Sequence, residues 1–326
     1  MNPDAPQSQF NVAASPHWRD GSSLPGIQQT WLLALLPAIV ASGVYFGFAG
    51  LRVVALAVVA SVIAEVVWNS LVPNRDFASN YSSVTMGVLL AFLLPVGAPW
   101  WLVVVGSFLT VIIGKKLYGG WGAYPVHPVA LGYAFLAVSW PSRLDYTESL
   151  VAQAWSVTMI EPMRLAKTLG TSAEASFNLT DLFLGLQVGG VGNALVLWLL
   201  LGGLFLVLVR EIPWQIPVGG ILGVVACAAL LGVVAADRSV SPVFHLLAGS
   251  TVLMIFFMAP EHTTSPVNPR PMFFYGLLMG VLMVLIRTFS IHVDGAIFAV
   301  LLANFFSPLL DRITPRILGQ EVQDIA

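Results

Sequence analysis

Charged side chains are scarce in this chain of 326 residues, where aspartate, glutamate, lysine and arginine together make up 9%. An ordinary soluble domain carries roughly 25%. The formal net charge of -2 excludes the strong positive charge that is typical of nucleic-acid-binding proteins. Hydrophobic residues make up 57% of the chain. The composition therefore indicates a protein that is embedded in a lipid bilayer.

Cysteine is almost absent, and several common site motifs are missing. The single Cys227 excludes an internal disulfide and a cysteine-ligated metal or iron-sulfur centre, so we interpret it as a packing residue. His245 and His262 have no second ligand at helical spacing, and no metal site is predicted. The stretch "VGGVGNA" at 188–194 lacks the strand that precedes a dinucleotide-binding turn. We expect its glycines to allow close packing of helices.

Long apolar runs dominate what is present. A spanning helix needs about 20 mostly apolar residues, and the chain offers ten candidates. The fold class predicted is therefore an all-α polytopic membrane protein. The expected spans are 30–48, 52–72, 82–96, 99–114, 127–140, 189–209, 215–236, 242–259, 272–289 and 293–310.

The polar stretches between these runs suggest the domain organisation. Residues 1–27 are polar and lack the pattern of a signal peptide, and a slight excess of arginine and lysine places both tails, 1–27 and 312–326, in the cytoplasm. The longest polar stretch, 142–188, is expected outside the cytoplasm as a loop region. It separates a first five-helix repeat at 28–141 from a second at 189–311.

Two similar apolar runs, each beginning with threonine and ending with proline, suggest that the two halves are related. Thr85 begins "TMGVLLAFLLP" in the first half, and Thr251 begins "TVLMIFFMAP" in the second. Because each half has an odd number of spans, two such repeats run in opposite directions across the membrane. This plan places a binding site near the bilayer midplane, at broken helices.

The stretch "GKKLYGGWGAYPVHP" at 114–128 interrupts two apolar runs with glycine, proline, lysine and aromatic residues. One interpretation is a cytoplasmic loop whose lysines and aromatic rings anchor to lipid head groups. The other is a segment that folds inward, because irregular backbone at membrane depth is tolerated only inside protein or beside a water-filled cavity. In that case we expect 114–128 and 259–270 to line one shared cavity.

Three carboxylates are candidates for an ion path. Glu65 lies deep in an apolar run, where a charge costs about 2.5 to 3.5 kcal/mol, so it should face the protein interior and either have a partner or carry a proton. Glu261 and Asp294 are expected at the ends of helices, where the surroundings are wetter.

Four stretches together resemble one known family. "DFASNYSSVTMGVLLAFLLPVGAPWW", "GKKLYGGWGAYPVHPVALGYAFL", "HLLAGSTVLMIFFMAPEHTTSPVNPR" and "IRTFSIHVDGAIFAVLLANFFSPLLD" are similar, in the same order, to stretches of the RnfD/NqrB family of membrane subunits. The resemblance covers about residues 28–318. It implies ten helices in two inverted five-helix repeats, a urea-transporter-like fold, and flavins that carry electrons in an ion-translocating oxidoreductase of the bacterial inner membrane.

The resemblance also implies site residues and partners. The partners are the other membrane subunits of such a complex and the lipid bilayer, with no nucleic acid. The cofactor expected is riboflavin or FMN, bound without a covalent bond. The flavin candidates are Thr85, Lys116, Gly119, Gly120, Tyr124 and His127, of which Tyr124 and His127 stand where the family usually has asparagine.

Covalent attachment of FMN is not expected in this chain. Family members with covalent FMN attach it through a threonine that is followed by proline and leucine. In "WSVTMIEPMRLAKTLG" the proline and lysine of the family pattern align with Pro162 and Lys167, and Glu161 then occupies the attachment position. A carboxylate cannot form the phosphoester, which leaves Thr158 as a weak candidate or no covalent FMN.

Three functions stay open at this point. The first is a redox subunit of an Rnf-like ferredoxin:NAD oxidoreductase complex that passes electrons through flavin and couples them to sodium or proton translocation. The second is a flavin-poor subunit that supplies structure and the ion path of such a complex. The third is a urea-transporter-like solute channel. An absorption spectrum separates the first from the other two.

Overall fold

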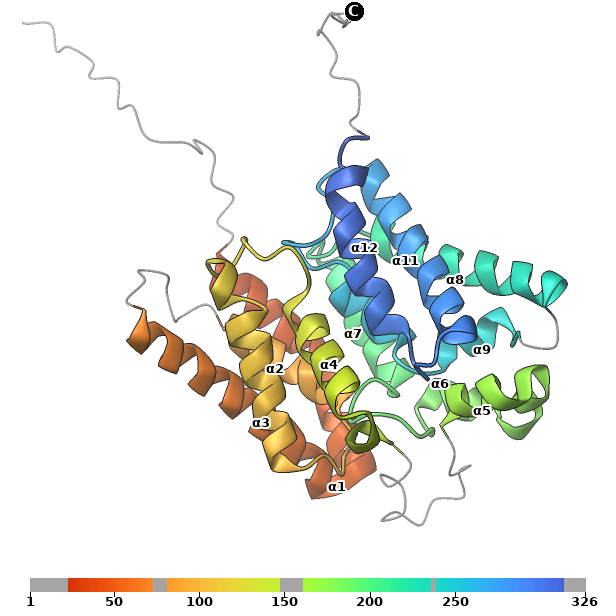
Figure 1. The fold of residues 1–326 in the computed structure, drawn as a ribbon, viewed down its shortest axis with the longest axis horizontal. Helices are drawn as coiled ribbons and strands as arrows, with labels where there is room; N and C mark the ends of the chain where they lie inside the picture. The colour runs from red at the N-terminus through yellow and green to blue at the C-terminus, as the bar shows by residue number, and fades with distance from the viewer. Residues whose placement is uncertain (1–22, 73–80, 147–160, 236–238, 314–326) are drawn as a thin grey trace, which may run out of the picture.

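A computed structural model describes residues 23–72, 81–146, 161–235 and 239–313. Within these ranges all regular structure is helical (Figure 1). Four helical stretches there are long and apolar enough to cross a membrane. They are α1 (Leu24–Leu71), Trp100–Tyr118, which joins α3 (Trp100–Phe108), η1 (Leu109–Ile113) and η2 (Lys116–Tyr118), α8 (Gln215–Val234) and α11 (Pro269–Phe289). The chain is therefore a multi-pass membrane protein, as the composition predicts.

Helix α1 is too long for one span and bends sharply at a glycine. Its 48 residues are interrupted at Gly47, where φ is 61° and ψ is -147°. A Cβ atom at Gly43 would lie 3.2 Å from Leu51, although residues eight apart in a straight helix are about 12 Å apart. The two limbs therefore fold back on each other, and they match the spans expected at 30–48 and 52–72.

The span expected at 242–259 is wrong as a continuous helix. Helix α9 (Pro242–Leu247) ends at Ala248, and α10 (Thr251–Leu253) continues into η7 (Met254–Met258). Between them Gly249 has a φ of 68°, which favours glycine. A Cβ atom at Gly249 would lie 2.9 Å from both Arg287 and Asp294, so the break is fixed by a tertiary contact.

The span expected at 189–209 is too long at its start. Helix α7 (Val196–Leu208) begins at residue 196, and the glycine-rich stretch before it forms turns. These turns pack on the end of α2 (Ser82–Leu93), where the amide of Val191 donates to the carbonyl of Leu94 at 2.9 Å. The predicted close packing of these glycines is confirmed, but it occurs in a turn: a Cβ atom at Gly192 would overlap the Phe92 ring at 2.2 Å.

The segment between the halves contains short helices within its described part. These are η3 (Pro141–Leu144), α5 (Pro162–Leu169), η5 (Gly170–Ser176) and α6 (Leu179–Leu184). Helices α5, η5 and α6 share a small apolar cluster with the region of α9, formed by Met163, Ala166, Ala173, Leu182, Val240, Phe244 and Ala248. This packing positions the segment against the second half.

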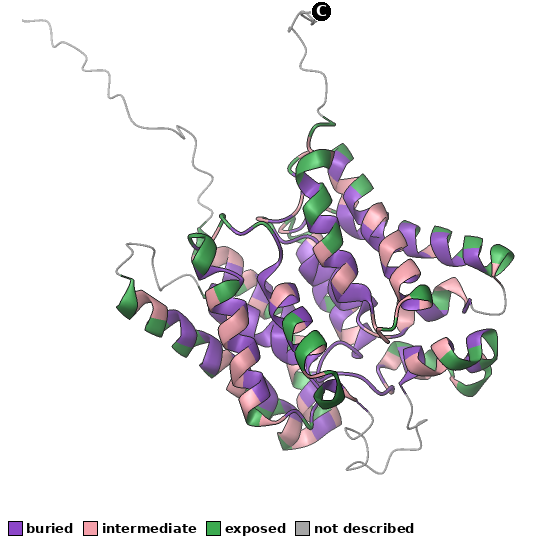
Figure 2. Cartoon of the chain, viewed as in Figure 1, coloured by how far each residue is buried: buried purple, intermediate pink, exposed green. Residues whose placement is uncertain are grey.

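Glycines allow the helices of the second half to approach closely. Cβ atoms at Gly219 and Gly276 would lie 2.3 Å from the carbonyls of Phe273 and Ile216, so α8 and α11 touch backbone to backbone. Helices α4 (Pro128–Ser139) and α12 (Ala296–Leu310) complete the bundle, whose centre is buried (Figure 2). Large apolar side chains on its outer faces are exposed, such as Phe48 at 82% and Val233 at 85%, as a lipid-facing surface requires.

Candidate functional site

A buried group of polar side chains lies where α1 ends and α2 begins. Lys115 donates to Glu65 at 2.8 Å and to Ser82 at 2.5 Å. Lys116 approaches the same carboxylate at 3.0 Å, and Ser83 donates to it. We refer to these five residues as the Lys115 cluster. Lys115 has no exposed surface, and Glu65 is 6% exposed.

The Lys115 cluster explains how Glu65 is tolerated in an apolar helix. A charge in hydrocarbon needs a partner or a proton, and the predicted interior partner of Glu65 is confirmed as Lys115. The carboxylate also meets Ser83 in the first turn of α2, where the positive end of the helix dipole favours an anion. The cluster therefore combines opposite charges with hydroxyl groups at a helix start.

The lysines of the stretch 114–128 point into the protein. The interpretation of Lys115 and Lys116 as lipid anchors is therefore wrong. The amines of Lys115 and Lys116 both point to Glu65, and Lys116 also donates to Asn69 at 3.1 Å. Gly119 and Gly120 follow with φ values of 113° and 101°, a conformation that L side chains rarely adopt. These glycines turn the chain from the lysines toward Tyr124.

The second part of this stretch contacts the other half of the protein. The hydroxyl of Tyr124 donates to Glu261 at 2.6 Å, and the amide of His127 donates to Asn304 at 2.9 Å. Glu261 also accepts from the amides of Thr263 and Thr264 at 3.1 and 3.2 Å. The expectation that 114–128 and 259–270 meet is therefore confirmed.

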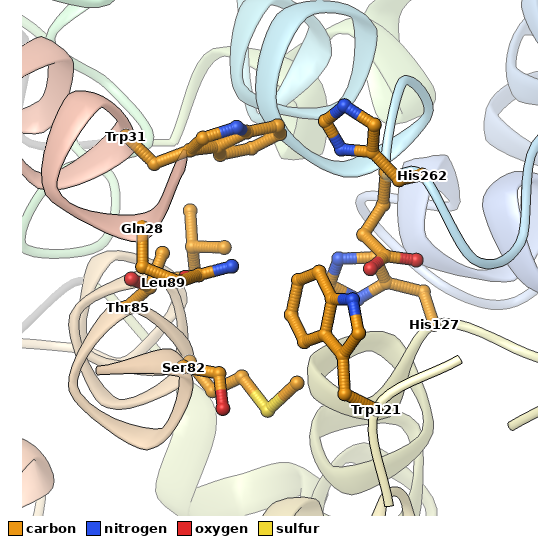
Figure 3. Close-up of a pocket in the computed structure, with 10 residues that line it drawn as sticks. Gln28, Trp31, Ser82, Thr85, Leu89, Trp121, His127 and His262 are labelled. Carbon is orange, nitrogen blue, oxygen red and sulfur yellow. The ribbon is translucent and has the colours of Figure 1, made fainter. Parts of the chain in front are cut away.

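The meeting point encloses a small pocket (Figure 3). Its free volume is about 20 Å³, which holds about one water molecule, whereas sites for organic ligands measure about 300–1,000 Å³. The residues that line it are Gln28, Trp31, Ser82, Thr85, Met86, Leu89, Trp121, His127, Glu261 and His262.

This arrangement does not fit a flavin ring between the two halves. Thr85 and His127 line the pocket, but Lys116 is paired with Glu65, and the Tyr124 hydroxyl is bonded to Glu261. Gly119 lies on the exposed edge of the stretch. The flavin candidates are thus brought near one another without a space for a three-ring cofactor among them.

A second buried ion pair joins Arg287, in the last turn of α11, to Asp294, which lies just before α12. Arg287 contacts Asp294 through Nε at 3.0 Å and Nη2 at 2.8 Å, and Nη1 donates to Thr251 at 2.7 Å. Asp294 also accepts from the amide of Ser250 at 2.8 Å and from its hydroxyl at 2.5 Å. We refer to Ser250, Thr251, Arg287 and Asp294 as the Arg287 cluster. Asp294 and Glu65 therefore lie in different clusters, and of the three carboxylates only Glu261 lines the central pocket.

Six members of the two clusters are not among the site candidates that the sequence suggests. They are Ser82, Ser83, Lys115, Ser250, Thr251 and Arg287, of which Lys115 is expected only as a lipid anchor. The signal for Arg287 is its position: an arginine near the end of the apolar run "VLMVLIRTF" requires a partner in the protein. In both clusters a cation and a carboxylate meet hydroxyl groups where a short helix begins.

Glu161 lies in the segment outside the long helices, and it is buried. It is 4% exposed, and the Nε atom of Arg164 lies 3.8 Å from its Oε2. Burial, together with the charge of Asp294, raises the pKa of Glu161 to about 8. Glu161 lines a cavity of about 200 Å³ with Tyr133 and Tyr146. Thr158, the weak candidate for covalent FMN, lies outside the described residues.

Comparison with known proteins gives one consistent result. Residues 11–319 match the family model described as NQR2, RnfD, RnfE family. The D subunit of the Na(+)-translocating ferredoxin:NAD(+) oxidoreductase complex of Acetobacterium woodii is 36% identical over 313 residues, which cover 95% of each chain. The D subunits of the ion-translocating oxidoreductase complexes of Mannheimia succiniciproducens and Pectobacterium atrosepticum are 33% and 34% identical. These alignments cover 96% and 95% of this chain and 99% of each relative. The chain therefore belongs to the NQR2, RnfD, RnfE family.

Proposed function

We propose that this chain is the membrane-embedded RnfD-type subunit of an Rnf-type ion-translocating ferredoxin:NAD oxidoreductase complex in the bacterial inner membrane. The observation that carries the proposal is similarity, over nearly the full length of both chains, to the D subunits of such complexes. The partners of the chain are the other membrane subunits of the complex. The four long apolar helices agree with a subunit that lies within the bilayer.

Within the complex, the chain supplies part of the path for a sodium ion or a proton. The Lys115 cluster, Glu261 and the Arg287 cluster are buried polar groups along a protein whose outer faces are apolar. Ionisable residues inside membrane proteins are costly and mark ion pathways. In this proposal Glu65 and Asp294 hold the moving ion or proton, while Lys115 and Arg287 balance the charge of each carboxylate.

The two halves form inverted repeats in this proposal, with both termini in the cytoplasm. Helix α2 in the first half and α10 with η7 in the second half are each followed by a proline, Pro95 and Pro260. Each of the two begins beside one of the ion-pair clusters. A cysteine at Ser172 should react with a membrane-impermeant maleimide added from outside, and one at Ser8 should not. The reverse pattern of labelling contradicts the orientation.

The flavin, riboflavin or FMN, is bound in this proposal without a covalent bond and at an interface with a neighbouring subunit. The small central pocket and the carboxylate at Glu161 both favour this arrangement over an enclosed or covalent flavin. A suitable surface is the exposed edge of the 114–128 stretch, where Tyr118 is 43% exposed and a Cβ atom at Gly122 would meet nothing within 4 Å. When bound, the flavin supplies one- and two-electron redox chemistry.

A flavin-poor subunit that contributes only structure and the ion path is the second candidate, and the 20 Å³ pocket is the observation that favours it. Flavin bands in the visible spectrum of the purified complex that disappear when this subunit is omitted support the first candidate. The solute channel is disfavoured, because the relatives that match over nearly the whole chain are subunits of ion-translocating oxidoreductase complexes.

Affinity purification tests the proposed identity. An affinity tag on this chain should recover the other membrane subunits from its native membranes, together with ferredoxin-dependent NAD reduction. A tagged chain that is recovered alone from intact membranes under mild detergent, with the activity left in the unbound fraction, contradicts the proposal.

A further inference from the structure

Two carboxylates line the cavity of about 200 Å³ that lies where the segment between the halves meets α4 and the start of α12. They are Glu161, which caps the start of α5, and Asp294, which lies just before α12. The lining also includes Ile291, which is 90% exposed, so the cavity opens to the surface. A space of this size holds several water molecules. The two carboxylates can therefore exchange a proton through water.

Glu161 lacks the close cation that keeps a buried carboxylate ionised. Among the described residues, the one cation within 4.0 Å of it is Arg164, at 3.8 Å, and Arg164 pairs with Asp145 at 2.9 Å. Asp294, by contrast, lies 2.8 Å from Arg287. A proton that the two carboxylates share therefore rests on Glu161.

The charge of Asp294 acts on Glu161. Burial is the largest cause of the raised pKa of Glu161, and the negative charge of Asp294 is the second. The titratable and charged groups around Glu161 are Tyr133, Asp145, Tyr146, Arg164, Arg287, His292 and Asp294. Positive charge that reaches Asp294 cancels its repulsion of the Glu161 carboxylate, and Glu161 then gives up its proton more readily.

A pair of phenols supplies the cavity with an oriented acceptor. Tyr146 donates to the carbonyl of Leu93 at 2.9 Å, and its oxygen lies 2.9 Å from that of Tyr133. Because the single hydroxyl proton of Tyr146 is used in this way, Tyr133 is the donor within the pair. The oxygen of Tyr133 keeps lone pairs that can accept from the cavity, which both tyrosines line. A protonated carboxyl group or a water molecule there has an acceptor that is fixed in place.

We propose that Glu161 is the group from which this subunit releases protons to the outside of the cell. When a proton reaches Asp294, the proton on the Glu161 carboxyl group passes to water in the cavity and leaves a carboxylate behind. The proton on Asp294 then moves through cavity water to this carboxylate, so that one proton leaves for each that arrives and both groups return to their first state. The inference rests on the proposed function, in which Asp294 holds the moving ion, and it names that ion as a proton.

The first experiment measures the protonation of Glu161 in the purified full-length chain. Infrared difference spectra between low and high pH detect the carbonyl stretching band of a protonated carboxyl group, and Glu161→Gln should remove a band that titrates near pH 8. Asp294→Asn should shift this titration to lower pH, whereas Asp181→Asn, in α6, should leave it in place. The absence of a titrating band that depends on Glu161 overturns the proposal, and so does a titration that Asp294→Asn leaves unchanged.

The second experiment uses variants of Glu161 alone, because Asp294→Asn leaves Arg287 buried without its carboxylate. Inverted membrane vesicles receive reduced ferredoxin and NAD in sodium-free medium, and a pH-sensitive dye reports the protons taken up per NADH formed. Glu161→Gln should lower this ratio, Glu161→Asp should restore part of it, and Asp181→Asn should leave it at the native value. Poor assembly alone lowers both rates together and leaves the ratio unchanged.

The outcomes separate this inference from the proposed function. A native ratio in Glu161→Gln overturns the inference, as does NADH formation by native vesicles without proton uptake. Recovery of the tagged chain without the other subunits contradicts the proposed function instead, and the infrared titration of the purified chain then still decides whether Glu161 carries a proton that responds to Asp294.

Discussion

The hydroxyl of Tyr124 lies 2.6 Å from Glu261 and donates to it a hydrogen bond that joins the two halves of the protein. Both residues lie in irregular segments, one before α4 and one after η7. Glu261 also lines the small pocket between the halves. Contact between the halves at this point is therefore built from polar groups, whereas the surrounding helices contact one another through apolar side chains.

Replacement of Tyr124 by phenylalanine should weaken the contact between the halves. The change removes a hydrogen bond to a charged group, which contributes about 1.5–3 kcal/mol, and leaves Glu261 with its bonds to Thr263 and Thr264. Thermal unfolding in detergent measures the loss. Tyr118→Phe, at a side chain that is 43% exposed, is the matched control. Equal stability of both variants contradicts a structural role for this bond.

The Lys115–Glu65 pair should be costly to break from one side only. Lys115→Met leaves Glu65 buried with Lys116 as its remaining cation, and loss of one partner from a buried pair costs about 3–5 kcal/mol. The double variant Lys115→Met, Glu65→Leu should recover part of the stability, because no uncompensated carboxylate is left, while Lys116 keeps its hydrogen bond to Asn69. The effect of Glu65→Leu is also measured alone, in the native chain. If Glu65→Leu lowers the stability of Lys115→Met by the same amount, the two residues are not coupled.

Glu161 should make the protein less stable as the pH rises. Its pKa is raised by burial from 4.5 to about 8, so the folded protein binds more protons than the unfolded chain between these values. The contribution of the protonated group to stability is fully present below pH 4.5 and is lost as the pH rises to about 8, by up to about 1.4 kcal/mol per pH unit. Unfolding measured at several pH values should show this loss.

Substitution tests the source of that pH dependence. Glu161→Gln cannot ionise and should flatten the decline between pH 5 and pH 8 (about the range set by the two pKa values). Asp181→Asn, which removes a carboxylate from α6 in the same segment, should leave the decline in place. An unchanged pH profile in Glu161→Gln assigns the decline to other groups.

No flavin should be attached covalently to this chain. The resemblance to the family, aligned on Pro162 and Lys167, implies that Glu161 stands at the attachment position, where a carboxylate cannot form a phosphoester. After denaturing electrophoresis the band of this chain should show no flavin fluorescence under ultraviolet light. A fluorescent band with a peptide that carries the mass of FMN on Thr158 would contradict this prediction.

The long apolar helices and the interior position of Glu65 could be predicted, because both follow from the cost of placing polar groups in hydrocarbon. The partner of Glu65 could not be predicted, since Lys115 lies 50 residues away in the chain. The break at Gly249 depends on contacts with Arg287 and Asp294 from distant elements. The small size of the central pocket depends on how side chains such as Trp121 pack, which no periodicity in the sequence encodes.

Ion uptake by inverted membrane vesicles from the bacterium that encodes this chain tests its proposed role in translocation. Reduced ferredoxin and NAD should drive uptake of sodium ions or protons in vesicles with the native chain, and deletion of the chain should abolish it. Complementation with Glu65→Gln should restore assembly of the complex but not ion uptake, whereas Glu211→Gln, outside the proposed path, should restore both. Full ferredoxin-driven uptake in the absence of this chain would contradict the proposed role.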